Sequence, residues 1–384
     1  MPNLFDIQDK AQCCGCSACF AACPTNAITL TLDSEGFLYP KISKEKCVDC
    51  NRCVQVCPLK KDRDNVAETK DFFAIKHRKK DTIQKSSSGG FFTAISDFIF
   101  EKGGVVYGVS FDENFRAIHT RADNQSARNK MCCSKYLQSD LGETFQMVKA
   151  DLTKGIPVLF TGTPCQVEGI HSYLGRDYKN FYAVDIICHG VPSPLMFSEH
   201  ITNIEKKRKT KVVNYKCRSK IKGWHTHTEE AFFKNGKSEA GTPLLQEHKV
   251  LFYKGYILRP SCYECRFTNL KRSSDITMGD FWGIEKSMPD WDDQIGTSMI
   301  LLNTPKGKQL FEAVHSDIEC RASETYGRQP QLERSAEKPS DREAFWTAYL
   351  NKGYRYIAAK YGRNNLKENL KFSVKKALKK YGLR

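Results

Sequence analysis

The sequence predicts a protein of mixed α+β and α/β class, with a small cysteine-rich N-terminal module, a larger α/β domain and a basic helical tail. Nine of the 17 cysteines lie before residue 60. Apolar segments then alternate with amphipathic ones, which is typical of an α/β sheet. The last residues repeat leucines at helical spacing among lysines and arginines. The expected boundaries are 1–60 for the module, 61–70 for a linker, 71–150 and 151–330 for two regions of the larger domain, and 331–384 for the tail.

Two cysteine runs in the N-terminal module have gaps of two, two and three residues and end before a proline. They are Cys13, Cys16, Cys19 and Cys23 before Pro24, and Cys47, Cys50, Cys53 and Cys57 before Pro58. This spacing is typical of ferredoxins with two 4Fe-4S clusters, in which the fourth cysteine of each run binds the other cluster. The first cysteine set is therefore Cys13, Cys16, Cys19 and Cys57, and the second is Cys47, Cys50, Cys53 and Cys23. Zinc is disfavoured because its sites use two cysteine pairs, and Cys14 is left spare.

The elements follow in order along the chain. Alternating residues around Glu35 and Gly36 predict a hairpin in the module, and the charged stretch after Pro58 predicts a linker. Phe91, Ile95 and Ile99 share one face of a helix that Gly103 and Gly104 end. Other helices are expected over 142–155 and 165–175. Strands are expected over 72–77, 105–111, 116–122, 157–161 and 181–187.

Four further cysteines form a third cysteine set: Cys165, Cys188, Cys262 and Cys265. Cys165 and Cys188 follow two consecutive apolar strands, whose carboxyl ends meet at one edge of a parallel sheet. Cys262 and Cys265 supply a CxxC pair. A third 4Fe-4S cluster is the preferred occupant, with zinc as the alternative. The cysteines left without a role are Cys14, Cys132, Cys133, Cys217 and Cys320.

The loop Ser86–Gly90 is the best candidate anion site, because small residues let backbone N–H groups approach a phosphate at the start of a helix. Simple N-capping explains the same residues equally well. The segment Gly279–Gly283 would either wall a planar ligand or form a turn with core aromatics. His189 and His225 are candidate proton donors, although lone histidines are more often structural. No GxGxxG fingerprint is present, which disfavours a standard nicotinamide domain.

The net charge of +16 is concentrated in the tail, where Leu366, Leu370, Val374, Leu378 and Tyr381 recur at helical spacing. Such a helix would lie on an anionic membrane surface or an acidic partner, or pack one face on its own domain, the last being the favoured alternative. No nucleic-acid motif accompanies the charge, so nucleic acid is not an expected partner. With no signal peptide, no apolar run long enough for a span and many cysteines, the expected location is cytoplasmic, with peripheral membrane attachment open.

Several segments together resemble the beta-subunit family of coenzyme F420 hydrogenases and dehydrogenases, in the version with an N-terminal two-cluster ferredoxin. They are "SSSGGFFTAI", "CSKYLQS", "VLFTGTPCQVEGI", "DIICHGVPSP", "CYECRF" and "DITMGDFWGIE". The resemblance runs to about residue 315 and makes 71–150 and 151–330 the N-terminal-like and C-terminal-like regions of that subunit. It implies FAD as well as an iron–sulfur cluster, and Cys165, Cys188, Cys262 and Cys265 match the family's cluster cysteines.

The resemblance also implies FAD contacts at Ser88, Gly89, Gly90, Ser134, Lys135, Tyr136, Thr161, Gly162 and Thr163. The family usually has glycine where this chain has Cys133. The implied function is an oxidoreductase that couples one-electron transfer through 4Fe-4S clusters to hydride chemistry at FAD, on an organic substrate or the deazaflavin F420. The alternative is an electron-input subunit that serves a separate hydrogenase, dehydrogenase or reductase in a multi-subunit complex. A redox protein such as ferredoxin is the expected electron partner.

Overall fold

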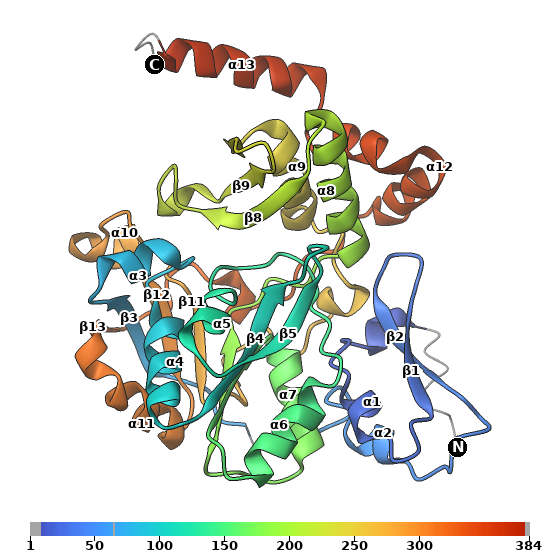
Figure 1. The fold of residues 1–384 in the computed structure, drawn as a ribbon, viewed down its shortest axis with the longest axis vertical. Helices are drawn as coiled ribbons and strands as arrows, with labels where there is room; N and C mark the ends of the chain where they lie inside the picture. The colour runs from blue at the N-terminus through green and yellow to red at the C-terminus, as the bar shows by residue number, and fades with distance from the viewer. Residues whose placement is uncertain (1–8, 64–65, 381–384) are drawn as a thin grey trace.

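The computed structural model describes residues 9–63 and 66–380 (Figure 1). Its largest element is an eight-stranded sheet in the order β13-β3-β12-β11-β7-β6-β4-β5. These strands are β3 Phe72–His77, β4 Val105–Phe111, β5 Ala117–Ala122, β6 Val158–Gly162, β7 Phe181–Ile186, β11 Ile276–Asp280, β12 Ser298–Leu302 and β13 Ile318–Ser323. The pairs β4–β6, β6–β7 and β7–β11 are parallel, and the flanking pairs are antiparallel. The expected α/β sheet is thus a mixed sheet.

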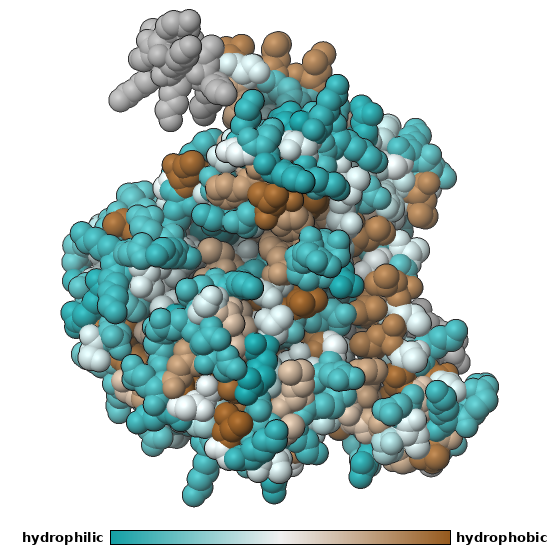
Figure 2. All heavy atoms as spheres, viewed as in Figure 1, coloured by the Kyte–Doolittle hydropathy of each residue, from teal (hydrophilic) through white to brown (hydrophobic). Residues whose placement is uncertain are grey.

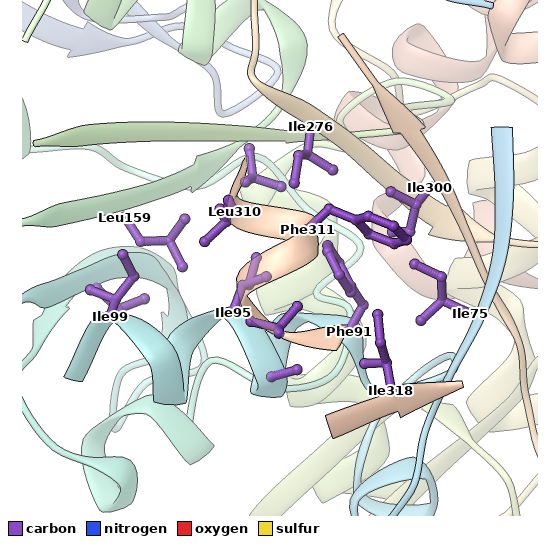
Figure 3. Close-up of a cluster of buried hydrophobic side chains, with 14 of the residues drawn as sticks. Ile75, Phe91, Ile95, Ile99, Leu159, Ile276, Ile300, Leu310, Phe311 and Ile318 are labelled. Atoms are coloured by element: carbon purple, nitrogen blue, oxygen red, sulfur yellow. The ribbon is translucent and has the colours of Figure 1, made fainter. Parts of the chain in front are cut away.

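Helices cover both faces of this sheet. On one face, Ile95 of α4 and Phe311 of α11 pack against Ile75 and Ile300 from the strands (Figure 3). On the other face, α6 and α7 pack against β4, β6 and β7. The helices of this domain are α3 Lys80–Lys85, α4 Phe91–Glu101, α5 Gln125–Asn129, α6 Thr144–Thr153, α7 Pro164–Leu174, α10 Ile284–Ser287 and α11 Pro305–Ala313. Burial of both faces explains the almost wholly apolar sequences of the central strands.

A second layer lies above the large sheet in Figure 1 and holds a three-stranded antiparallel sheet. Its elements are α8 Pro194–Arg208, β8 Val212–Ser219, β9 Thr228–Phe233, β10 Ser238–Ala240, α9 Pro243–Tyr253 and α12 Arg342–Lys360. Phe345, Trp346 and Ile357 of α12 are buried against α8 and α9. Residues 342–360, which were expected in a basic tail, therefore belong to the packed core of this layer.

The N-terminal module contains α1 Ala18–Ala22, β1 Ile28–Leu32, β2 Leu38–Ile42 and α2 Arg52–Gln55. The strands pair antiparallel from Ile28 opposite Ile42 to Leu32 opposite Leu38, so the predicted hairpin is present. Asp33 Oδ1 accepts the backbone N–H of Glu35 and of Phe37, which fixes the turn. The small size of these elements leaves most of the module to be ordered by what binds to it or packs on it.

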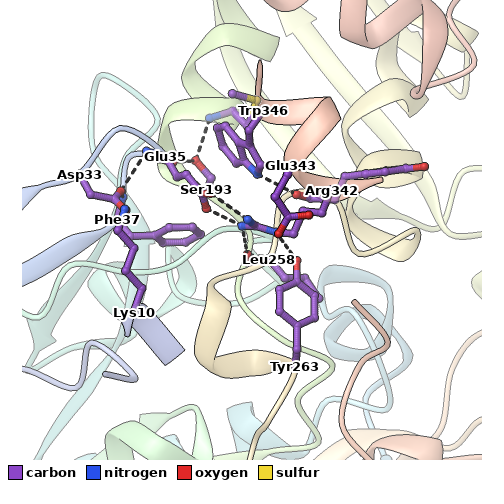
Figure 4. A network of polar contacts seen from close by, with 12 residues as sticks. Lys10, Asp33, Glu35, Phe37, Ser193, Leu258, Tyr263, Arg342, Glu343 and Trp346 are labelled. Atoms are coloured by element: carbon purple, nitrogen blue, oxygen red, sulfur yellow. Dashed lines mark hydrogen bonds and ion pairs between the residues drawn. The ribbon is translucent and has the colours of Figure 1, made fainter. Parts of the chain in front are cut away.

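The N-terminal module is docked firmly on the larger domain. Arg342 of α12 forms an ion pair with Glu35 in the hairpin turn and also donates to the carbonyl of Leu258 (Figure 4). Ser193 donates its hydroxyl to the carbonyl of Glu35. In the segment expected to be a linker, the buried Arg63 donates to the carbonyls of Arg266 and Lys271. The chain leaving the module is therefore anchored to the larger domain.

The last helix, α13, spans Leu366–Lys380 and projects from the second layer. Leu366, Leu370 and Val374 are 87%, 65% and 52% exposed, and apolar side chains lie along its outer edge in Figure 2. The favoured expectation, that this face packs on its own domain, is wrong for these three residues. The side chain of Leu378 and the whole of Tyr381 lie outside what the structure describes. Among the described residues, no helix is both long and apolar enough to cross a membrane.

Candidate functional site

The structure brings the first cysteine set together. Cys16 and Cys19 lie beside Cys13, and Cys57 reaches the same place from the second run. Burial, followed by the neighbouring thiols of Cys13 and Cys57, raises the pKa of Cys19 to about 12. Cys57 also has its pKa raised, first by burial and then by Cys13 among other groups. Cys57 of the second run therefore lies beside cysteines of the first run, as the predicted exchange of the fourth cysteine requires.

The second run folds like the first. In both, a residue in the left-handed region precedes the helix that carries the third cysteine: Ser17 has φ 59° and Asn51 has φ 55°. Cys53 has its pKa raised by burial and then, among other groups, by Cys50 and Cys47, so these three thiols are neighbours. Cys23, the predicted fourth member, accepts the backbone N–H of Ala27 at 3.2 Å. Burial acts to raise the pKa of Cys23, but backbone hydrogen bonds of this kind outweigh it and lower that pKa.

The third cysteine set also converges, from three separate segments. Cys165 lies in the first turn of α7, Cys188 follows β7, and Cys262 ends a 3-10 helix at Pro260–Cys262. Burial, then Cys262, Cys165 and Cys265, raises the pKa of Cys188 well above its ordinary value. In the described part of the chain, no three His, Cys, Asp or Glu side chains are close enough to hold a single metal ion.

Cys14, which spacing leaves without a role, lies between the first and third sets. It is buried, and its side chain interacts with those of Cys16 and Cys165. The hydrogen bond to Cys16 is the largest of the effects that raise the pKa of Cys14 well above its usual value. The only sequence signal for this arrangement is the adjacency of Cys13 and Cys14.

A cavity of about 970 Å³ opens at the carboxyl ends of the parallel strands, where α/β sheets bind ligands. Its wall includes most of the residues expected to contact FAD: Ser88, Gly90, Ser134, Lys135, Tyr136, Thr161, Gly162 and Thr163. Gly89 packs against the sheet instead, with its N–H donated to Ser298 Oγ at 2.9 Å. Cys188 of the third cysteine set also lines the cavity.

The loop Ser86–Gly90, called the serine loop below, forms part of the cavity wall. Gly90 is the N-cap of α4 with φ 88°, a backbone conformation that suits glycine, and Phe91 and Phe92 continue the lining. Ser87 Oγ accepts the backbone N–H of Ser134 at 2.8 Å, which ties the serine loop to the second expected contact segment. The positive end of the α4 dipole therefore borders the cavity.

Two features of the segment at Cys133–Tyr136 shape this part of the cavity wall. Cys133 has φ 74°, which explains why glycine is usual at this position in the family that the sequence resembles. Lys135 lines the cavity, but its ammonium lies 2.9–3.1 Å from the carbonyl oxygens of residues 130–133. Burial lowers the pKa of Lys135 to about 8. The Lys135 ammonium therefore binds the carbonyl oxygens of its own loop.

The cavity also has an aromatic wall, which was one of the two alternatives for Gly279–Gly283, although nothing in the sequence indicated that Arg218 and His227 join it. Trp282 stacks on His227 with centroids 4.5 Å apart and lies under the Arg218 guanidinium. Arg218 is itself paired with Asp280 at 2.8 Å. The Gly279–Gly283 segment therefore supplies both a core aromatic, Phe281, and a cavity wall, Trp282.

The histidines of the cavity are buried to different degrees. His189 and His225, the two candidates from the sequence, both line the cavity. Burial lowers the pKa of His189, while His225 is held by Asp292 at 3.0 Å. Burial, with the Arg218 charge, lowers the pKa of His227 to about 4. His189 and His227 are therefore uncharged near neutral pH.

Two segments of the chain match models of known protein families. Residues 157–325 match the family model that describes the C terminus of the coenzyme F420 hydrogenase/dehydrogenase beta subunit. Residues 12–61 match the model of a 4Fe-4S dicluster domain. A chain in a solved structure of the F420-reducing [NiFe] hydrogenase complex from Methanosarcina barkeri is similar, with 15% identity, a TM-score of 0.46, and coverage of 79% of this chain and 93% of that one. No curated protein matches the sequence.

The fold and the cysteine motifs thus define an iron–sulfur redox protein of the oxidoreductase type. Its residues 157–325 match the C terminus of the coenzyme F420 hydrogenase/dehydrogenase beta subunit, and its N-terminal residues match a 4Fe-4S dicluster domain.

Proposed function

We propose that the protein couples one-electron transfer through 4Fe-4S clusters to hydride chemistry at FAD, on an organic substrate or a deazaflavin. One observation carries this proposal: Cys188 belongs to the third cysteine set and also lines the large cavity. A cluster on that set would lie directly beside a ligand in the cavity. FAD, when bound, exchanges two electrons with organic molecules and single electrons with clusters.

The residues present fit these groups. Each cysteine set offers thiols alone, the donors that iron–sulfur clusters take. We assign two clusters to the module and a third to Cys165, Cys188, Cys262 and Cys265. The cavity lies at the upper end of the usual size for ligand pockets and combines an aromatic wall with backbone donors. The α4 N-terminus at Gly90 would hold the FAD phosphates, and the side of the cavity at Trp282 would stack a planar ring.

The protein's own groups limit the charge that a substrate would meet. Arg218 is neutralised by Asp280, and His227 is uncharged near neutral pH. The Lys135 ammonium is occupied by carbonyls of its own loop. A planar substrate would therefore be stacked at the Trp282 wall, while Glu285, Arg328 and Glu333 supply charge elsewhere in the lining. The Cys188 side of the cavity would be the direction of electron exchange.

A second function is favoured by the family model, which describes a beta subunit and hence one part of a larger assembly. In that case, the chain passes electrons to or from a separate hydrogenase, dehydrogenase or reductase. Ferredoxin is the one-electron partner in either case, and the exposed Cys50 makes the second cysteine set the natural point of contact. F420 reduction by the isolated chain would support the first function, and a requirement for a second protein would support the second.

The exposed apolar stripe on α13, with lysines around it, supports peripheral attachment to an anionic membrane. Attachment would leave the N-terminal module free for its redox partner, because α13 and the module lie at opposite ends of the molecule (Figure 1).

Anaerobic purification with iron, sulfide and flavin analysis tests the main proposal. Three clusters give roughly twelve irons per chain, with one FAD. About eight irons would show that the third cysteine set holds no cluster. Full iron without flavin would refute the flavin half alone.

A further inference from the structure

The first and third cysteine sets lie close together, on either side of the contact between the module and α7. Cys16 lies against Gly169 of α7, where an added Cβ would be 2.9 Å from that of Cys16. The same helix carries Cys165 in its first turn, and Cys14 interacts with both Cys16 and Cys165. Two clusters bound here would face one another across the boundary between the module and the larger domain.

Arg259 is a buried cation at this junction. Arg259 is fully buried, just ahead of the 3-10 helix that contains Cys262. Its Nε donates to the carbonyl of Cys13 at 2.7 Å, and its Nη2 contacts Cys13 Sγ at 3.4 Å. Further bonds go to Leu38 and Gln138, and the guanidinium lies 4.1 Å from the Tyr39 ring centroid. Within the described residues, Arg259 has no carboxylate within ion-pair distance.

The groups that favour the positive charge of Arg259 are mainly cysteine thiols. Burial alone would lower the pKa of Arg259. The pKa is nevertheless raised, by the neighbouring side chains of Cys13, Tyr39, Cys14 and Cys262. In return, Arg259 counteracts the burial that raises the pKa of Cys262 to about 12. A buried guanidinium without a carboxylate is costly unless another negative group compensates it. A cluster with thiolate ligands is such a group.

We propose that Arg259 is a positioning residue that raises the reduction potential of the cluster on the first cysteine set and couples it electrostatically to the cluster on the third. This rests on the proposed function. Reduction adds one electron, and so one negative charge, to a cluster. A nearby positive charge and an N–H···S bond stabilise that reduced form, and both are known to set cluster potentials.

Arg342 is a matched control. It is also a buried arginine between the module and the larger domain, but its charge is paired with Glu35. Its contacts go to Glu35, Leu258 and Tyr263, and none of these is a cysteine. Removing Arg342 weakens docking, whereas removing Arg259 alters docking and the cluster environment together.

The test is an EPR-monitored redox titration of the anaerobically reconstituted full chain, with dithionite as the one-electron reductant. We expect R259Q to lower the ratio of reduced to oxidised first-set cluster about tenfold at a fixed potential, which is about 59 mV for a one-electron couple. R259K keeps the charge and should retain most of the wild-type potential. R342Q should leave it unchanged. Equal potentials in R259Q and the wild type, or an equal shift in R342Q, would overturn the proposal.

Loss of iron has its own interpretation. If R259Q fails to hold the first-set cluster, R259K decides: retention of iron at a near-native potential supports the role of charge, and loss of iron from R259K as well makes Arg259 a purely structural residue. The wild-type iron count and EPR signals test the clusters themselves. Failure of the proposed function is therefore distinguishable from failure of this inference.

Discussion

The Cys14 and Cys165 side chains interact, although one belongs to the N-terminal module and the other to the sheet edge of the larger domain. The first cysteine set is thereby placed beside the third, and the third beside the cavity through Cys188. The order of the sites in space is module, sheet edge, cavity. Under the proposed function, this order would make the module the entry for single electrons and the cavity the site of the organic substrate.

Replacement of Cys14 by serine should leave the iron content unchanged, whereas Cys13→Ser should lose about four irons, those of one cluster. The reason is that Cys13, and not Cys14, is among the groups that interact with Cys19. Iron and sulfide analysis of the anaerobically reconstituted variants checks this. Equal losses in both variants would show that the ligand frame starts elsewhere.

Gly90→Asp should abolish flavin binding. The residue caps α4 beside the cavity, so a carboxylate there would repel the phosphates. Its φ of 88° adds roughly 1–2 kcal/mol of backbone strain. Flavin content is the measurement, and Gly103→Asp is the control, because Gly103 also has positive φ but is at the far end of α4. Full flavin occupancy in Gly90→Asp would refute the placement.

Acid should destabilise the protein through His119. Burial lowers the pKa of His119 to about 4, compared with about 6.5 in the unfolded chain. As pH falls, the unfolded state gains a proton before the folded state does. The stabilisation is therefore complete above about pH 6.5 and is lost toward pH 4, by about 2 kcal/mol at pH 5.

His119→Phe keeps the ring that stacks on Phe160 and removes the titrating group. The fall in Tm of the anaerobic holoprotein between pH 7 and pH 5 should then be smaller than in the wild type. An unchanged fall would place the acid sensitivity on other groups.

The α13 stripe should bind anionic vesicles. The full chain is expected to co-sediment with vesicles that contain phosphatidylserine but not with pure phosphatidylcholine, and Leu370→Glu should weaken this binding. Leu350→Glu on α12 is the matched control, because Leu350 and Leu370 are 67% and 65% exposed. Binding that survives Leu370→Glu in full would remove α13 from the interface.

The sequence predicted the local elements well, because their periodicities are strong. The strand at 181–187 and the helix at 91–101 lie where the pattern placed them. The pairing of β3 between β12 and β13 could not be predicted, since it joins segments more than 200 residues apart. Fold topology at this range depends on packing and is not encoded in local pattern.

The site was predicted where spacing dictates chemistry and missed where folding alone brings residues together. The three cysteine sets came from motif spacing and from strand ends. Arg259 had no signal other than its place just before the CxxC segment, and Trp282 and His227 meet only through the second layer. The apolar residues of α12 were a usable signal, with Phe345, Trp346 and Ile357 buried, that the basic composition of the tail obscured.

The central claim is that a cluster on the third cysteine set connects the module to a flavin in the cavity. Stopped-flow reduction of the bound flavin by reduced ferredoxin, compared between the wild type and Cys188→Ser, tests it most directly. We expect Cys188→Ser to lose about four irons, to keep its flavin and to reduce that flavin far more slowly, while the module clusters are still reduced at the native rate. Flavin reduction at the full wild-type rate in a variant that lacks those irons would contradict the account.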